Sequence, residues 1–217
     1  MPQILKVDPS SWENTLSETK KVLKAGGIVA FPTDTFYGLG VNPYNRIAVD
    51  KIYEIKGRDP KKPLLLLIDS VTKLENLVEE PSAACIKLMQ TFWPGPLTLL
   101  FKPKPSSIHE NITADLIGIR QPGNPVTRKI LSELDHPLTA PSANISGGAP
   151  ATTAQQVQDT FGEKVELILD AGECQGGKPS TLINATDAPA RLIRAGEVDF
   201  EDIQECLKGF LQTQESL

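Results

Sequence analysis

The sequence predicts an α/β fold, in which a twisted mixed β-sheet is flanked by helices and carries a basic ligand cleft. Stretches with helical apolar spacing alternate with short apolar runs of strand length. Several predicted strands follow one another directly, which a strictly parallel sheet with helical crossovers does not allow. The 16 glycines and 18 prolines fall between these segments, a pattern typical of one domain with many elaborated loops.

The predicted helices have apolar residues at a spacing of three to four. They cover residues 11–25, a segment after Asn45, residues 71–78, a segment after Pro81, and residues 125–134, 152–161 and 200–211. A serine can cap the first helix, Asn45 the second and Asp199 the last. Strands are predicted over residues 28–31, 64–68, 97–102, 116–120, 165–170, 181–185 and 191–194.

The length of 217 residues is enough for one domain with a sizeable core. We expect residues 1–217 to form a single domain, with its core over about residues 10–200. The N-terminus lacks the signature of a signal peptide, and no apolar run approaches the roughly 20 residues that span a bilayer. We therefore expect a cytoplasmic protein without a membrane segment.

Charge and cysteine usage exclude several classes of protein. The net charge is −5 and the pI about 5.2, which argues against a general nucleic-acid coat but permits cations gathered in one cleft. The three cysteines show no metal-ligand spacing, and neither His109 nor His136 lies in a recognisable arrangement with a cysteine or carboxylate. We expect no zinc site and no thiol nucleophile.

One motif must be rejected. Residues 172–178 match the first seven positions of a phosphate-binding P-loop after a predicted strand. The next position should supply a magnesium-binding hydroxyl and begin a helix, but it is Pro179, and strand-forming residues 180–183 follow.

Six loops share small hydroxyls, glycine, proline and single cations. They are residues 32–40, 56–63, 118–122, 140–148, 178–181 and 194–196. Most follow a predicted strand, where ligand crevices form in α/β sheets. Their cations suit phosphate or carboxylate: Lys56, Arg58, Lys61, Lys62, Arg120 and Arg194. One such loop alone is typical of a turn, and Asp34 can either shape its turn or position an amine or a metal ion.

Taken together and in order, these loops resemble the YrdC/TsaC family of threonylcarbamoyl-AMP synthases. The matching segments are residues 31–40, 56–58, 93–98, 119–120, 141–144, 180–181 and 192–194. Longer members carry an additional C-terminal domain, and this chain looks like the single-domain, YrdC-like form.

The resemblance implies a reaction that joins L-threonine, bicarbonate and ATP into threonylcarbamoyl-AMP and pyrophosphate. A partner transferase would then carry the threonylcarbamoyl group to an adenosine of tRNA, with which this chain would make at most weak contact. Such chemistry needs no covalent enzyme intermediate, so positioning and charge neutralisation suffice.

The resemblance also implies roles for individual residues. Lys56 and Arg58 are the expected catalytic cations. The expected ATP contacts are Lys56, Arg58, Lys62, Thr113, Ser142, Asn144 and Arg194, and the expected threonine contacts are Thr35, Arg120 and Ser180. Mg²⁺ would accompany ATP, held by phosphates and water, since no dedicated carboxylate cage is found.

The chain departs from the family pattern at three positions. Asp59 separates Arg58 from the expected proline, Leu67 stands where some relatives have histidine, and Ala195 replaces a proline. These departures leave open a paralogue with another substrate. An RNA-binding module that uses the basic cleft is a further alternative, although the acidic pI argues against it.

Overall fold

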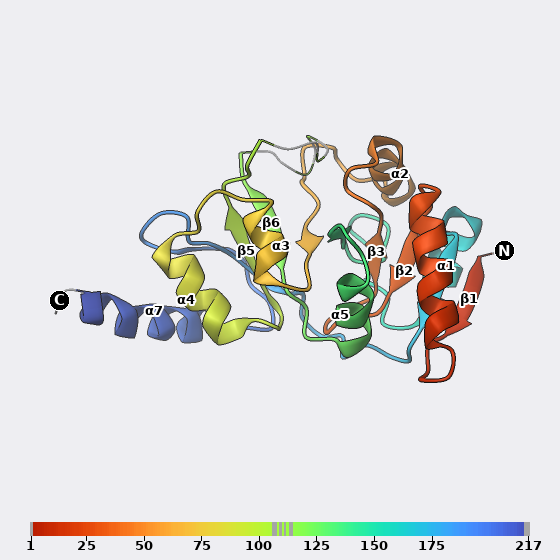
Figure 1. The fold of residues 1–217 in the computed structure, drawn as a ribbon. Helices are drawn as coiled ribbons and strands as arrows, with labels where there is room; N and C mark the ends of the chain where they lie inside the picture. Colours follow the sequence, from red (N-terminus) through yellow and green to blue (C-terminus); the bar gives the residue numbers. More distant parts are fainter. Residues whose placement is uncertain (1, 106–107, 109, 111, 113–114, 215–217) are drawn as a thin grey trace.

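The computed structural model describes residues 2–105, 108, 110, 112 and 115–214. The molecule is elongated, with its two termini at opposite ends (Figure 1). Its strands form two mixed sheets, flanked by helices. Within the described ranges, no helix is both long and apolar enough to cross a membrane.

The four-stranded sheet lies toward the N-terminal end (Figure 1). Its order is β1 (Gln3–Lys6), β8 (Leu167–Asp170), β2 (Val29–Phe31) and β3 (Gly38–Gly40). β8 runs parallel to both of its neighbours, whereas β2 and β3 are antiparallel.

The six-stranded sheet lies toward the C-terminal end. Its order is β10 (Arg191–Arg194), β9 (Thr181–Asn184), β5 (Leu97–Phe101), β6 (Ile117–Arg120), β4 (Leu66–Leu67) and β7 (Leu138–Thr139). The pairs β9–β5 and β4–β6 are parallel, and the others are antiparallel.

Backbone hydrogen bonds join the two sheets where β3 runs beside the segment that contains β7. The Leu39 amide donates to the Pro141 carbonyl at 2.9 Å, and the Ala143 amide donates to the Tyr37 carbonyl at 2.7 Å. The Thr139 hydroxyl donates to the Leu39 carbonyl at 3.1 Å. The predicted mixed sheet flanked by helices is therefore confirmed, with its strands divided between two sheets that meet at this seam.

Seven α-helices pack on these sheets within the described part of the chain. They are α1 (Trp12–Lys24), α2 (Arg46–Lys56), α3 (Val71–Glu75), α4 (Ala83–Phe92), α5 (Pro125–Ser132), α6 (Ala154–Phe161) and α7 (Phe200–Gln214). The predicted Asn45 cap is confirmed, because its side chain accepts from the Ala48 amide. The serine cap on α1 is wrong: Ser11 Oγ instead accepts from the Asp8 amide and donates to the Lys6 carbonyl.

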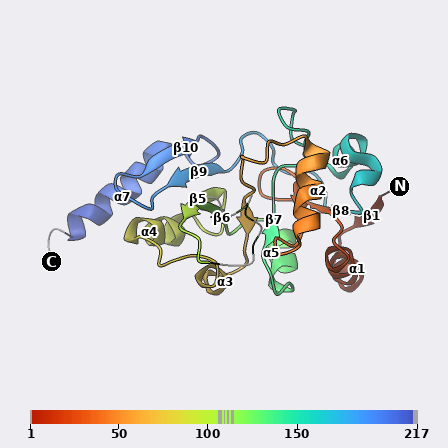
Figure 2. The same ribbon diagram turned by 90° about the horizontal axis from the view of Figure 1, so that it is seen from above.

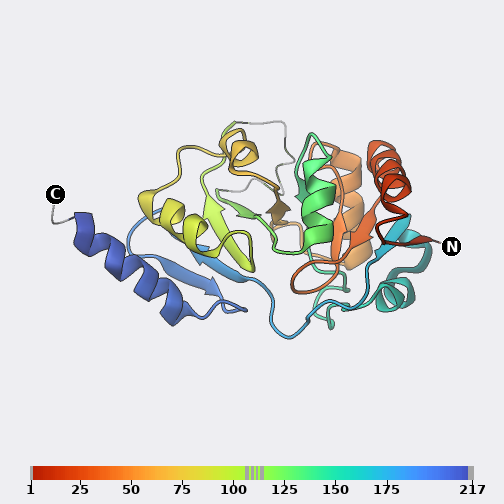
Figure 3. The ribbon, with the colours of Figure 1, turned by 60° about the horizontal axis from the view of Figure 1, so that its bottom comes forward.

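The helices form two layers. In the view from above, α1 and α5 lie on one side of the four-stranded sheet, and α2 and α6 lie on the other (Figure 2). Leu23 of α1 and Ile130 of α5 share one apolar cluster, whereas Ile52 of α2 and Val157 of α6 belong to a second. At the opposite end, α4 packs against α7 (Figure 3).

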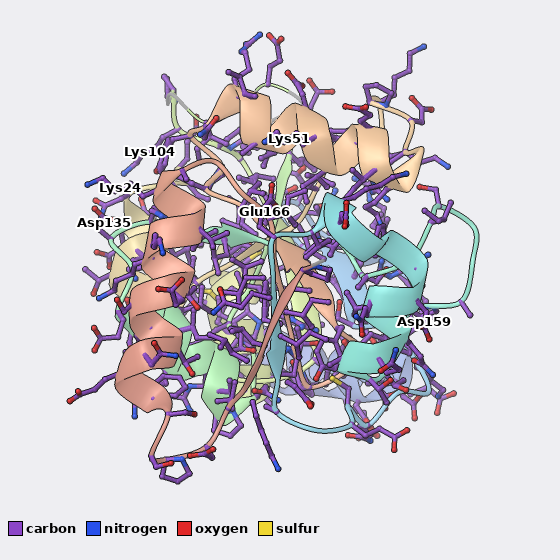
Figure 4. The ribbon with its side chains drawn as sticks, turned by 90° about the vertical axis from the view of Figure 1, so that its right-hand side faces the viewer. Lys24, Lys51, Lys104, Asp135, Asp159 and Glu166 are labelled. Atoms are coloured by element: carbon purple, nitrogen blue, oxygen red, sulfur yellow. The ribbon has the colours of Figure 1, made fainter. Side chains whose placement is uncertain are left out.

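Polar contacts fix the turn that leads from α1 into β2. Seen from the N-terminal end, Glu166 lies centrally among α1, α2 and α6 (Figure 4). Its carboxylate accepts the Ile28 amide at 2.7 Å. From α2, Lys51 Nζ reaches the Gly26 carbonyl at 3.5 Å. Gly26 has a φ of 75°, a left-handed conformation that suits glycine and ends the helix as predicted.

Candidate active site

A cavity of about 780 Å³ lies over one face of the six-stranded sheet, beside the seam with the four-stranded sheet. Strands β5, β6, β9 and β10 and the loops after β2, α2, β7 and β8 contribute to its wall. Six predicted site residues line it: Thr35, Arg58, Arg120, Ser142, Ser180 and Arg194. The structure therefore brings together loops that are far apart in the sequence.

Two threonine hydroxyls mark the end of the cavity near β2. Thr33 Oγ1 donates its single proton to the Phe36 carbonyl at 2.7 Å. The 3.1 Å bond between the Thr33 and Thr35 hydroxyls must then use the proton of Thr35. The Thr35 oxygen consequently retains acceptor capacity, which suits an amine or a hydroxyl of a ligand.

Arg120 is a buried cation with unused donor capacity. Its side chain is 4% exposed, and Nη2 lies 3.1 Å from Asp34 Oδ1. Nε has no hydrogen-bond partner in the described structure, and neither does Asp34 Oδ2. Burial lowers the pKa of Arg120, while Asp34 opposes that shift. A buried guanidinium with a free donor is costly in isolation, so this end of the cavity is suited to an anion.

Arg194 folds back from β10 over Ser180. Its Nη2 donates to the Ser180 carbonyl at 2.8 Å and to the Ser180 hydroxyl at 3.0 Å. The same hydroxyl lies 2.8 Å from Thr98 Oγ1. Burial lowers the pKa of Arg194, and the nearby charges of Arg120 and Arg58 lower it further. Arg58, Arg120 and Arg194 all line the cavity, so three guanidinium-bearing side chains converge on it.

Gly196 allows this close approach of β10 to Ser180. A Cβ atom at Gly196 would overlap the backbone of residues 179–181. No side chain can therefore replace glycine here without displacing the backbone that carries Ser180.

Arg58 and Lys61 extend into the cavity from the loop that follows α2. Arg58 Nε donates to the Lys62 carbonyl at 3.0 Å, and its Nη2 donates to the Pro63 carbonyl at 2.9 Å. These bonds curl the guanidinium over its own loop. Lys61 is among the lining residues, whereas Lys62 is not.

Lys56 is buried behind the cavity wall. Its ammonium donates to the carbonyls of Ser142 and Asn144, each at 2.6 Å, and the residue is 2% exposed. Burial, followed by repulsion from Arg58, lowers the pKa of Lys56 to about 8. The cation thus fastens α2 to the loop after β7, and it is not among the residues that line the cavity.

The side chain of Asn144 also serves this loop. Its Oδ1 accepts from the Ser142 hydroxyl at 2.6 Å, and its Nδ2 donates to the Gly148 carbonyl at 2.9 Å. Asn144 is absent from the cavity lining, whereas Ser142 is present. Thr113 lies outside the described residues.

The roles predicted for three lining residues were incomplete. Thr33 and Thr98 line the cavity and lie inside predicted motifs, but the sequence predicts no role for them, and it predicts Lys61 only as a cation of its loop. Their position after or within a strand was the available signal.

In the part of the chain described, no group of three His, Cys, Asp or Glu side chains could hold a metal ion. The rejection of a P-loop is confirmed, because β9 follows residues 172–178 where a P-loop requires a helix.

A sequence model of the Sua5/YciO/YrdC proteins, described as "telomere recombination", matches residues 21–196. The chain belongs to the Sua5/YciO/YrdC family. It is 40% identical over 187 residues to the threonylcarbamoyl-AMP synthase of Pyrococcus abyssi, covering 85% of this chain and 55% of the relative. It is 35% identical to a putative threonylcarbamoyl-AMP synthase of Methanocaldococcus jannaschii, covering 94% of this chain and 96% of the relative.

Solved structures agree with this assignment. The crystal structure of P. abyssi Sua5 complexed with L-threonine superposes with a TM-score of 0.87 and 35% identity, over 95% of this chain and 60% of that one. The present chain thus spans little more than half the length of the P. abyssi relative. The resemblance and the YrdC-like fold expected from the loops are confirmed.

Within this family fold, two departures have a structural explanation. Asp59 Oδ1 accepts the Lys61 amide at 2.9 Å, so it shapes the turn that presents Lys61. Leu67 is fully buried and pairs with Arg120 in the register of β4 and β6. It therefore places an apolar side chain next to Arg120 in the sheet.

Proposed function

We propose that this chain condenses L-threonine, bicarbonate and ATP into threonylcarbamoyl-AMP and releases pyrophosphate. The observation that carries this proposal is the convergence of Arg58, Arg120 and Arg194 on one cavity that also holds the hydroxyls of Thr35 and Ser180. Similarity to proteins named threonylcarbamoyl-AMP synthase supports it.

Threonine would occupy the end of the cavity that is lined by Thr35 and Arg120. Arg120 offers its unused Nε to a carboxylate, and a guanidinium pairs with carboxylates through parallel hydrogen bonds. The free acceptor capacity of Thr35 and the hydroxyl of Ser180 would then orient the amine and hydroxyl of the amino acid. Asp34 pairs with Nη2 of the same guanidinium and helps to hold it in place.

ATP would place its phosphates near Arg58, Lys61 and Arg194. The carbamate, which forms from threonine and bicarbonate with loss of water, carries the attacking oxygen. This oxygen bonds to the α-phosphorus as the bond to pyrophosphate breaks. No protein nucleophile takes part. The cations offset the charge on the phosphates, and enclosure of both reactants supplies the positioning. Mg²⁺ bound to the phosphates would neutralise further charge.

Of the remaining predicted ATP contacts, only Lys56 has a structural argument behind it. Lys56 anchors the loop that presents Ser142, so we propose that it acts on ATP through that loop and through its charge. Contacts of Lys62, Asn144 and Thr113 with ATP stay predictions. So do the single-domain organisation, the cytoplasmic location, the downstream tRNA transferase and a weak contact with tRNA.

Mass spectrometry tests the proposed activity. Purified chain incubated with ATP, threonine, bicarbonate and Mg²⁺ should yield threonylcarbamoyl-AMP and pyrophosphate, and omission of any one of the three substrates should abolish the product. Pyrophosphate release with another amine, but not with threonine, would instead identify a paralogue. Salt-sensitive RNA binding without ATP binding would identify the RNA-binding alternative.

A further inference from the structure

Thr33 lines the cavity, but its hydroxyl has no hydrogen-bonding capacity left for a ligand. This hydroxyl donates its proton to the Phe36 carbonyl at 2.7 Å and accepts the Thr35 amide at 3.1 Å. The hydroxyl of Thr35, also at 3.1 Å, uses its second lone pair. Because a hydroxyl has one proton and two lone pairs, Thr33 can act on a ligand only through Thr35.

Thr98 and Ser180 form a second hydroxyl pair on the cavity wall, with their oxygens 2.8 Å apart. The Ser180 oxygen also accepts from Nη2 of Arg194 at 3.0 Å. One of the pair's two protons lies between the oxygens, and no acceptor elsewhere in the described part of the chain takes the other. This pair therefore offers a proton to a ligand, whereas the pair of Thr33 and Thr35 offers none.

The two pairs give the cavity opposite hydrogen-bonding polarities at two places. A ligand must bring an N–H or O–H to Thr35, and an oxygen of the ligand can accept from the pair that contains Ser180. An amino acid meets both conditions, since its amine donates and its oxygens accept. A ligand with an oxygen acceptor at Thr35 would instead leave two acceptors facing each other, which costs free energy in a buried site.

We propose that Thr33 is a positioning residue that selects the amine of the amino acid substrate and keeps its nitrogen reactive. By taking the proton of Thr35, it turns the Thr35 oxygen into an acceptor that binds an N–H and leaves the nitrogen lone pair uncovered. A Thr35 hydroxyl free to donate would bind that lone pair. This inference rests on the proposed function, in which the amine reacts with bicarbonate.

Carbamate formation uses the lone pair of the amine. The nitrogen of the neutral amine bonds to the carbon of bicarbonate, and the C–O bond to the hydroxyl group breaks. The departing hydroxide takes a proton from the nitrogen, so that the products are the carbamate and water. The carbamate nitrogen keeps one N–H, and an acceptor at Thr35 therefore suits both the amine and the carbamate.

The experiment compares Thr33→Val with Thr33→Ser by calorimetric binding of L-threonine, O-methyl-L-threonine and (R)-3-hydroxybutanoate. Valine keeps the shape of the side chain but removes the hydroxyl, so the proton of Thr35 is released. The two ligands that carry the amine should bind about tenfold more weakly to Thr33→Val, whereas (R)-3-hydroxybutanoate, which lacks it, should change by less than about threefold. Thr33→Ser, which keeps the hydroxyl, should restore the affinity of the unmodified protein within about threefold.

Thr19→Val is the matched control. Thr19 is a buried residue of α1 whose hydroxyl donates to the Thr15 carbonyl at 2.7 Å, outside the cavity. Its removal should lower the melting temperature but leave the affinity for all three ligands unchanged. The role of Thr33 is overturned by an unchanged affinity for threonine in folded Thr33→Val, or by an equal loss of affinity for (R)-3-hydroxybutanoate.

If Thr33→Val does not fold, neutron diffraction from crystals of the unmodified protein with L-threonine decides. A hydroxyl deuteron of Thr35 directed at Thr33 supports the inference, and one directed at the ligand refutes it. Product formation by the unmodified chain, measured separately, reports on the proposed function alone.

Discussion

The two most buried cations of the candidate site, Lys56 and Arg120, are used in different ways. Lys56 is 2% exposed and Arg120 is 3% exposed. The ammonium of Lys56 is bound by two backbone carbonyls at 2.6 Å. Arg120 has one ion pair with Asp34, and its Nε remains without a partner. The first charge holds a loop, whereas the second is available to a ligand.

This difference separates structural from binding roles that the sequence groups together. A buried charge must be compensated, and the identity of its partners shows what it serves. Carbonyl partners fix the backbone, so Lys56 acts by positioning Ser142. An incompletely satisfied guanidinium in a cavity wall is instead suited to bind an anion.

The largest expected effect follows the loss of Arg120. We predict that Arg120→Ala raises the KM for threonine by about 100-fold or more, since truncating one partner of a buried charge pair costs several kcal/mol. It should also lower the melting temperature, because Asp34 is left buried and unpaired. Steady-state kinetics and calorimetry measure both quantities.

The double variant Asp34→Ala/Arg120→Ala serves as the control. Removal of both charges should restore much of the melting temperature without restoring the affinity for threonine. Recovery of threonine binding in the double variant would show that Arg120 acts only on stability.

A smaller effect is expected for Lys56→Met, which keeps the chain length and removes the charge. The loop of residues 142–148 loses its anchor, so ATP affinity should fall by about tenfold while threonine affinity stays unchanged. Limited proteolysis should cut this loop faster than in the unmodified protein. Equal losses of affinity for ATP and threonine would contradict a role confined to the loop.

The charge of Lys56 should also make ATP binding depend on pH. Its pKa is lowered from 10.5 to about 8, so the ammonium loses its proton as the pH rises through 8. ATP affinity should therefore decline between pH 7 and pH 9 in the unmodified protein and show no such step in Lys56→Met. Calorimetric titrations with ATP at several pH values measure this decline. An ATP affinity of the unmodified protein that stays constant between pH 7 and pH 9 would contradict the role assigned to Lys56.

Linkage fixes the sign of the accompanying change in stability. Because the folded-state pKa lies below the ordinary value, the unfolded chain binds this proton more tightly between about pH 8 and 10.5. The free energy of unfolding should thus rise with pH, relative to that of Lys56→Met, across this window. Denaturant titrations of both proteins measure the difference.

The smallest effect distinguishes two adjacent lysines. Lys61 lines the cavity and Lys62 does not, although the sequence favoured Lys62. Lys61→Ala should weaken ATP binding by about threefold, the scale of one exposed charge, and Lys62→Ala should have less effect. A larger effect of Lys62→Ala would support the original expectation.

Much of the fold follows from the sequence because its helices have strong periodicity. The Asn45 cap and the strand of residues 191–194 are found as predicted. The sequence does not predict strands β3 and β7. β3 has three residues, two of which are glycine, and β7 has only two residues, so neither shows an alternation of apolar and polar side chains. Their pairing depends on contacts between distant segments, which local patterns do not encode.

The sequence predicts which loops form the candidate site. It does not predict which atoms within these loops contact one another. Strand ends gather at one crevice, so Thr35, Arg120 and Ser180 were expected to lie together. The carbonyl partners of Lys56 depend on how the loop after β7 folds over α2, and composition gives no sign of this.

A crystal structure of the chain with L-threonine and a non-hydrolysable ATP analogue tests the contrast between the two cations most directly. We predict that the threonine carboxylate binds Arg120, while Lys56 keeps its bonds to the carbonyls of Ser142 and Asn144. A threonine carboxylate bound away from Arg120, or a Lys56 ammonium that leaves both carbonyls to bind threonine, would contradict the division between a ligand-binding and a loop-holding charge.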